Sequence, residues 1–303
     1  MNAPARREMV QDLEQFRSEV RQWLEDNCPA SQRQPITPEE QYYGGRNAEF
    51  PSEDAKIWFE RMRDKGWICP EWPTEYGGGG LSPQEAKIIK EEMKALRART
   101  PLYSIGIWML GPALLEFGNE AQKQQHIRAI INGEARWAQG YSEPGSGSDL
   151  ASLQCKAEDQ GDHFLVNGSK IWTTAADKCD WIFCLVRTNP DAKKQEGISF
   201  LLIDMDDPGI STSPIALISG ESELCQTFFD NVKVPKENLV ENSTRAGALP
   251  RRYWCTNASS CQNWAVTHRG RSSHPALLPA NTLRLKTAKS PMLSCAPTWW
   301  TMT

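Results

Sequence analysis

A loop rich in glycine and serine is the first stretch of this 303-residue chain whose residue types could do chemistry. It runs Gln139-Gly-Tyr-Ser-Glu-Pro-Gly-Ser-Gly-Ser-Asp149 and offers backbone N–H groups and hydroxyls to an anion or to the polar edge of a ring. Gly145 and Gly147 give the spacing G-x-G, but position 150 is leucine and strands are expected to follow rather than a helix. This pattern excludes a Rossmann-type fingerprint. The alternative to a binding loop is a plain surface loop with no ligand.

A second stretch with chemical potential lies about twenty residues further on, at Asn167-Gly-Ser-Lys-Ile-Trp-Thr-Thr174. A tryptophan after a hairpin turn is usually part of a core. Here Trp172 is followed by two hydroxyls, a combination suited to stacking on a flat ring while hydrogen bonding its edge. Neither stretch identifies a function alone.

Helical patterns dominate the residues before these two motifs. Apolar residues at steps of three and four predict an amphipathic helix between Met9 and Asp26. Three further helices are predicted from N-cap residues at Ser52, Ser82 and Asn119, because each has the residue type and surroundings of a cap. The sequence therefore predicts an N-terminal helical domain over residues 1–134.

The pattern changes from a helical period to a period of two after Arg136. Short β-type runs separated by good turn formers are expected at 152–158, 163–167, 181–186, 198–203, 210–216 and 224–234. This spacing is typical of a small antiparallel barrel or sandwich. The predicted fold class is α+β, with a β-domain over residues 135–241 that carries both motifs.

Residues 242–303 follow neither period. They contain 8 Lys and Arg and no Asp or Glu, together with four Trp and three Cys. Ordinary disordered segments are poor in Trp and Cys, so this composition favours an out-of-frame tail, with a disordered tail as the other interpretation. A basic nucleic-acid-binding tail is the alternative, but such a tail would cluster its Lys and Arg.

Composition excludes several other classes of protein. The nine cysteines are odd in number and contain no CxxC pair, which predicts reduced thiols and a cytoplasmic location. The four histidines lie far apart, so no metal site is expected. No run of about eighteen apolar residues predicts a membrane span, and the polar Met1–Arg7 segment is unlike a signal peptide.

Taken together and in this order, the two motifs resemble those of the acyl-CoA dehydrogenase family. The loop is similar to T-E-P-G-(A/S)-G-S-D, with Ser142 where threonine is usual, and the second motif is similar to N-G-x-K-x-W-I-T, with Thr173 in place of isoleucine. Three weaker similarities flank them, at 66–78, 117–123 and 229–239. The resemblance covers about four-fifths of the chain and indicates the family without indicating a member.

The resemblance implies FAD as the cofactor and assigns roles to residues of both motifs. Backbone and side-chain groups of Gln139, Tyr141 and Ser142 would line the pyrimidine edge of the flavin. Trp172 would lie against the isoalloxazine ring, with Thr173 beside it and Thr174 bonding near N5. Ser148 would contact both FAD and the acyl-CoA substrate. Donors at the pyrimidine edge make physical sense, because they stabilise the anionic reduced flavin.

The resemblance also implies a reaction, the α,β-dehydrogenation of an acyl-CoA to a trans-2-enoyl-CoA in fatty acid metabolism, with electron transfer flavoprotein as acceptor. The family base is a glutamate of a C-terminal four-helix domain that also makes homo-oligomer contacts. No Glu follows Glu241, so the catalytic residue is unknown and the chain is expected to be truncated, with little activity.

Two alternatives remain open at this point. One is a flavin-dependent monooxygenase or nitroalkane oxidase of the same superfamily, although the intact motif from Glu143 to Asp149 favours the dehydrogenase branch. The other is a non-catalytic subunit that binds flavin or acyl-CoA, which would predict a tail with a folding pattern of its own.

Overall fold

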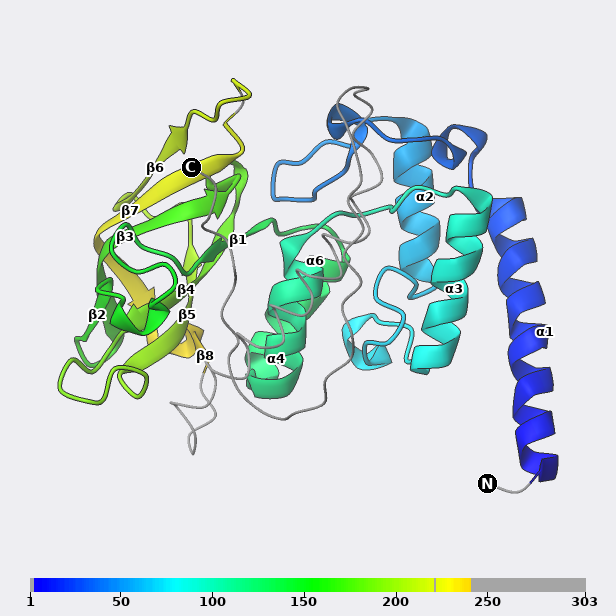
Figure 1. The fold of residues 1–303 in the computed structure, drawn as a ribbon, viewed down its shortest axis with the longest axis horizontal. Coiled ribbons are helices and arrows are strands. Elements are labelled where there is room, and N and C mark those ends of the chain that lie inside the picture. Colours follow the sequence, from blue (N-terminus) through cyan, green and yellow to red (C-terminus); the bar gives the residue numbers. More distant parts are fainter. Residues whose placement is uncertain (1–2, 221, 241–303) are drawn as a thin grey trace, which may run out of the picture. The chain divides into compact units, whose positions relative to one another are not determined.

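Helices occupy the first part of the chain and strands the second (Figure 1). The computed structural model describes residues 3–220 and 222–240, with side chains from Asp12 onward, so the predictions for residues 242–303 lie outside it. The α-helices are α1 (Ala3–Asn27), α2 (Glu53–Asp64), α3 (Pro83–Leu96), α4 (Gly111–Phe117), α5 (Glu120–Gln122) and α6 (Arg128–Ile131). The strands are β1 (Trp137–Gly140), β2 (Lys156–Asp159), β3 (His163–Thr174), β4 (Trp181–Arg187), β5 (Ile198–Asp204), β6 (Ile210–Ile215), β7 (Leu224–Pro235) and β8 (Leu239–Val240).

The three N-caps predicted from the sequence are all present. Ser52 accepts a hydrogen bond from the backbone of the first turn of α2, and Ser82 and Asn119 both form capping boxes. The segment after Asn119 runs through α5, a π-helical turn over Lys123–Ile127 and α6. A helix over 105–117, which begins with a π-helical turn, was not predicted. Among the described helices, none is long and apolar enough to cross a membrane.

Helices α1, α2 and α3 share one apolar core. Val20 and Leu24 of α1 pack with Trp58 of α2 and with Ile88 and Ile89 of α3, and all five side chains are buried. Figure 1 shows α1 alongside α3. At the edge of this core Arg17 and Arg21 both hydrogen bond the buried carboxylate of Glu92, so the charge on Glu92 is paired rather than left in an apolar interior.

The strands form one mixed sheet in the order β6-β7-β3-β2-β4-β5-β8, with β1 also paired to β4. The sequence patterns predicted an antiparallel arrangement, and most pairs follow it, but β1 and β2 both run parallel to β4. Parallel neighbours need a long connection between them. Here β1 is connected to β4 through the glycine- and serine-rich loop, β2 and β3, and β2 is connected to β4 through β3. The loop itself joins β1 to β2, which both pair with β4. It was interpreted as a loop before a first strand, whereas β1 already precedes it.

Strand β4 is buried on both of its faces. Phe183 and Leu185 pack into the core shared with the helices of residues 106–131, whereas Ile182, Cys184 and Val186 pack into a second core on the opposite face of the sheet. A strand buried on both sides has a continuous apolar sequence rather than an alternating one. The loop therefore leaves and rejoins the sheet beside a strand that is buried on both faces.

Gln122 connects the helical part of the chain to the end of the sheet. Its side-chain amide donates hydrogen bonds to the carbonyls of Glu237 (2.7 Å) and Leu239 (2.9 Å), while its oxygen accepts from the backbone of Asn119 (3.1 Å). Gln122 is 4% exposed, so these bonds satisfy polar groups that are shielded from water.

A buried histidine lies where helices and sheet meet. His126 is 2% exposed, and its ring makes edge contacts with Trp137 and Trp181. Its Nε2 atom has no hydrogen-bond partner among the described residues. Burial lowers the pKa of His126 from 6.5 to about 4, because an imidazolium cation would be poorly solvated there.

We expect the free energy of unfolding to fall as the pH drops from 6.5 towards 4. In this window the unfolded chain binds a proton at residue 126 that the folded chain does not, so stability is present above the unfolded pKa and is lost below it. The loss should reach roughly 3 kcal/mol, from about 1.4 kcal/mol per pKa unit. Urea unfolding of the wild type and of a His126→Leu variant at several pH values would measure it. Carboxylates titrate in both proteins, so only the difference between the two plots of unfolding free energy against pH reports on His126. If the two plots ran parallel, the prediction would be contradicted.

Candidate functional site

The glycine- and serine-rich loop is an excursion from a single edge of β4. Strand β1 pairs with residues 181–184 of β4, and Lys156 at the start of β2 pairs with Arg187. Because β5 occupies the other edge of β4 along its whole length, β1 and β2 lie end to end on the same edge. Residues 141–155 therefore leave the sheet after the pair with Cys184 and return at the pair with Arg187. Both ends of the loop are thus held at the same edge of β4.

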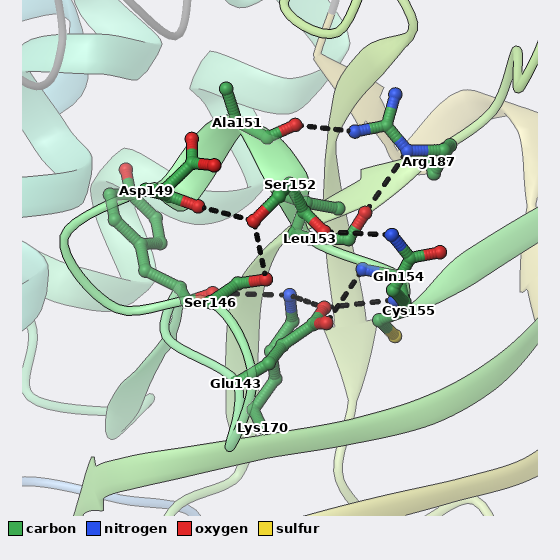
Figure 2. Close-up of polar contacts among 11 residues, drawn as sticks. Glu143, Ser146, Asp149, Ala151, Ser152, Leu153, Gln154, Cys155, Lys170 and Arg187 are labelled. Carbon is green, nitrogen blue, oxygen red and sulfur yellow. Dashed lines mark hydrogen bonds and ion pairs between the residues drawn. The ribbon is translucent and has the colours of Figure 1, made fainter.

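A buried carboxylate fixes the two ends of the loop to each other (Figure 2). Glu143 Oε2 accepts a hydrogen bond from the backbone N–H of Gln154 (2.6 Å), and Oε1 accepts one from that of Cys155 (2.8 Å). Oε1 also pairs with Nζ of Lys170 on β3 at 2.8 Å. Nζ donates in addition to the carbonyl of Tyr141 at 3.2 Å. The side chains of Lys170 and Glu143 are 0% and 7% exposed, so the two charges neutralise each other in a largely dry interior.

The returning half of the loop is held by a second charged residue. Arg187 donates to the carbonyls of Leu153 (3.0 Å) and Ala151 (2.7 Å). The Ser152 hydroxyl donates to the carbonyl of Asp149 at 2.7 Å, which leaves its oxygen to accept from the hydroxyl of Ser146 at 3.1 Å. Figure 2 shows these contacts lying on the inner side of the loop, whose tip between Pro144 and Asp149 is mostly exposed.

Trp172 protrudes from a β-bulge next to this loop. On β3, Lys170 pairs with Thr227 and Thr173 pairs with Cys225, so two residues of β3 face one residue of β7. Within the bulge the N–H of Ile171 donates to the carbonyl of Ser142 at 2.9 Å, which joins the two motifs through their backbones. Trp172 has a φ of +63° and is 54% exposed. It is therefore not the core residue that was the alternative interpretation, and it occupies a left-handed backbone region that non-glycine residues rarely adopt.

The seven residues proposed from the sequence differ in how their side chains are engaged. Gln139, Ser142, Ser148 and Thr174 are exposed or half-buried, and no hydrogen bond of their side chains exists among the described residues. Tyr141 is 8% exposed and packs edge-on against Phe183. Thr173 is fully buried, with its hydroxyl bonded to the carbonyl of Cys225 and to Thr227, so it offers no side-chain atom to a ligand.

The contacts bring some of these residues together. The bond between Ile171 and Ser142 places Ser142 beside the bulge that carries Trp172. Gln139 and Tyr141 lie at the end of β1 and the start of the same loop. The FAD roles assigned from the family resemblance require Ser148, Trp172 and Thr174 to border one face of the β-domain. No contact connects Ser148 to Trp172 or Thr174 among the described residues, so this arrangement is a prediction. At Gly145 and Gly147 an added Cβ would meet no atom within 4 Å, so the tip is open to a ligand.

A shallow hollow of about 620 Å³ lies on one side of the loop. It is lined by residues of the loop and of strands β3 and β7, namely Glu143, Pro144, Gly145, Ser146, Ser152, Gln154, Cys155, Gly168, Ser169 and Phe228. None of the seven proposed residues lines it.

Sequence reasoning assigned no role to Glu143, Lys170 or Arg187. For Glu143 and Lys170 the available signal was that acidic residues stand in the first motif and one basic residue stands in the second. Lys170 also falls on the same face of β3 as the buried Thr173 once the bulge is counted, but the bulge itself cannot be recognised from alternation alone.

Comparison with known proteins gives the same family for both parts of the described chain. Residues 11–134 match the N-terminal domain of acyl-CoA dehydrogenases, and residues 138–232 match the middle domain. Acyl-CoA dehydrogenase IpdE1 of Mycobacterium tuberculosis is 37% identical over 232 residues, covering 76% of this chain and 59% of the relative. Acyl-CoA dehydrogenase FadE29 of the same organism is 38% identical over 233 residues, covering 77% of this chain and 57% of the relative.

Solved structures show the same likeness. The Tcur3481-Tcur3483 steroid ACAD superposes with a TM-score of 0.60 at 28% identity, covering 86% of this chain and 69% of that chain. The ChsE4-ChsE5 complex from Mycobacterium tuberculosis superposes with a TM-score of 0.60 at 31% identity, covering 81% of this chain and 60% of that chain. The chain spans less than two thirds of the length of the two curated relatives above.

Proposed function

The chain belongs to the acyl-CoA dehydrogenase family through its N-terminal and middle domains, and on this premise we propose that it binds FAD and an acyl-CoA at the loop and bulge described above. One observation carries the proposal. Trp172 is held exposed in a strained bulge, beside a loop whose polar side chains at Ser142 and Ser148 have no partner among the described residues. Strain of this kind persists where function requires it.

The residues present fit a flavin. The exposed indole of Trp172 offers an apolar face to a flat ring, and Thr174, two residues on, offers a hydroxyl to its edge. Gln139, Ser142 and the backbone of the loop tip offer donors to the polar edge, and Ser148 is assigned to both FAD and substrate. When bound, FAD would take up the two electrons removed from the acyl chain. Thr173 is left out of the proposed set, because its hydroxyl is used inside the sheet.

The substrate proposal stops at the class of acyl-CoA. Relatives carry names as different as steroid ACAD, glutaryl-CoA dehydrogenase and isovaleryl-CoA dehydrogenase, which share the thioester and differ in the acyl group. Electron transfer flavoprotein as the acceptor, and the cytoplasm as the compartment, are proposed on the family resemblance and on the cysteine content of the sequence. The monooxygenase and non-catalytic alternatives are not favoured by any of these likenesses.

Substitution of Trp172 tests the proposal because it should separate binding from stability. A Trp172→Ala variant should bind FAD about tenfold more weakly, since stacking and the area it buries contribute on the order of 1.4 kcal/mol. A Trp172→Gly variant should lose as much affinity, yet be more stable than the alanine variant by about 1 kcal/mol, because glycine adopts the positive φ without strain. FAD titration followed by fluorescence, and urea unfolding, would measure the two effects.

A Trp172→Phe variant is the matched control for this experiment. It retains an aromatic face and the same backbone strain, so FAD binding should stay within a few fold of the wild type. Equal FAD affinity in the alanine, glycine and wild-type proteins would show that the flavin does not lie against Trp172, and the proposed site would be wrong.

A further inference from the structure

The Glu143 carboxylate joins three segments that are distant in sequence. It lies at the start of the loop tip, accepts from the backbone where the loop returns at Gln154 and Cys155, and pairs with Lys170 two residues before Trp172. These contacts use both of its oxygens, so the carboxylate has three protein donors. The two motifs of the proposed site are therefore connected through one buried side chain.

The burial of this pair makes the connection strong. Removing either charge leaves the other buried and without its partner, at side-chain exposures of 0% for Lys170 and 7% for Glu143. In the half of the loop that returns to the sheet, Arg187 donates hydrogen bonds to the carbonyls of Ala151 and Leu153. The loop is thus fixed on its inner side in the absence of any ligand, whereas Gly145, Gly147 and Ser148 at its tip remain exposed.

We propose that Glu143 and Lys170 are positioning residues that hold the loop tip and the Trp172 bulge in their binding arrangement before a ligand arrives. The pair contacts the ligand through neither charge. It acts by lowering the amount of ordering that binding requires, which raises affinity without adding a contact. The functional part of this inference rests on the proposed FAD site, whereas the ordering of the loop does not.

Hydrogen exchange of the ligand-free 303-residue chain tests the ordering. A Glu143→Gln variant removes the charge, keeps one acceptor and presents an NH₂ group to one of the backbone donors. Amide exchange should rise about tenfold over 142–155 and 171–175, because local opening becomes easier there, and stay unchanged in α2. The matched control is Glu158→Gln, which removes the carboxylate of the exposed pair with Lys156 in the same sheet and should change neither segment. Unchanged exchange at 142–155 in the Glu143→Gln variant would overturn the proposal.

FAD titration separates positioning from a general loss of stability. The Glu143→Gln variant should bind FAD about tenfold more weakly than the wild type. A Val20→Ala variant, which is destabilised in the core of α1, α2 and α3, should retain wild-type affinity. If FAD affinity fell equally in both variants, Glu143 would affect binding only through the stability of the fold. The positioning claim would then be overturned.

The two experiments distinguish failure of the proposed FAD site from failure of the proposed positioning role of Glu143. If the wild type itself shows no FAD binding, the proposed function fails, while the exchange data still decide whether Glu143 orders the loop. If Glu143→Gln does not fold, Glu143→Asp replaces it in both measurements. Its charge is retained, but the shorter side chain cannot reach Lys170 and both backbone donors together, so the same rise in exchange is expected.

Discussion

We expect the 303-residue chain to leave flavin absorbance unbleached when it is mixed anaerobically with FAD and acyl-CoA thioesters. In the family that the chain resembles, the base is a glutamate of a C-terminal helical domain, and residues 242–303 contain neither Glu nor Asp. A positioned general base contributes on the order of 10²–10⁴-fold to proton transfer. Without that base, an acyl chain would also not be held between base and ring, which should lower the rate further.

The carboxylate nearest to the proposed site cannot substitute for this base. Both oxygens of Glu143 already accept hydrogen bonds, from Lys170 and from two backbone N–H groups. Abstracting a substrate proton would require breaking these contacts inside a buried cluster. Asp149 is exposed beside Lys194, so water competes for it at the loop surface. Proton abstraction requires a carboxylate that is both available and shielded from water, whereas Glu143 is engaged and Asp149 is exposed.

The measurement is a stopped-flow record of flavin absorbance with a panel of steroid-derived, glutaryl and isovaleryl thioesters. The acyl-CoA dehydrogenase IpdE1 of Mycobacterium tuberculosis, which is similar to this chain, serves as the positive control for the assay. Prompt bleaching with any thioester would show that residues 1–303 contain a functional base. The expectation that the catalytic base lies outside these residues would then be wrong.

Local signals in the sequence were sufficient for most helices and most strands, although the helix over 105–117 was not predicted. A cap acts within one turn, so Ser52, Ser82 and Asn119 could be recognised without tertiary information. The six β-runs correspond to β2 through β7. Strand β8 was missed because two residues cannot show a period of two, and β1 was missed because its sequence, Trp-Ala-Gln-Gly, does not alternate between apolar and polar residues.

The contacts that build the site could not be read from the sequence in the same way. Whether Glu143 faces solvent or Lys170 depends on the register of β3 against β7, and the bulge at Ile171 and Trp172 shifts that register. The parallel pairing of β1 with β4 depends on which edge of β4 is open. Both are properties of strands far apart in sequence, so the motifs predicted where a ligand binds and not what holds the binding residues in place.

The second large effect should come from Lys170. We expect a Lys170→Met variant to lose about 3–5 kcal/mol of unfolding free energy, since removing one partner of a buried pair leaves an uncompensated charge. The methionine fills a similar volume, so little of this cost should arise from a cavity. Lys156→Met is the matched control, because its pair with Glu158 is exposed and should contribute less than about 1 kcal/mol.

A double variant distinguishes charge from hydrogen bonding in the same cluster. Lys170→Met combined with Glu143→Gln removes both charges, and the glutamine oxygen can still accept from Gln154 or from Cys155 but not well from both. We therefore expect the double variant to regain about half of the unfolding free energy that Lys170→Met loses. The other half stays lost, because one buried donor left unpaired costs about 1–3 kcal/mol. Urea unfolding followed by circular dichroism would measure all four proteins. If the double variant were no more stable than Lys170→Met alone, the cost would come from packing around residue 170, and the ion pair would not be what joins the two motifs.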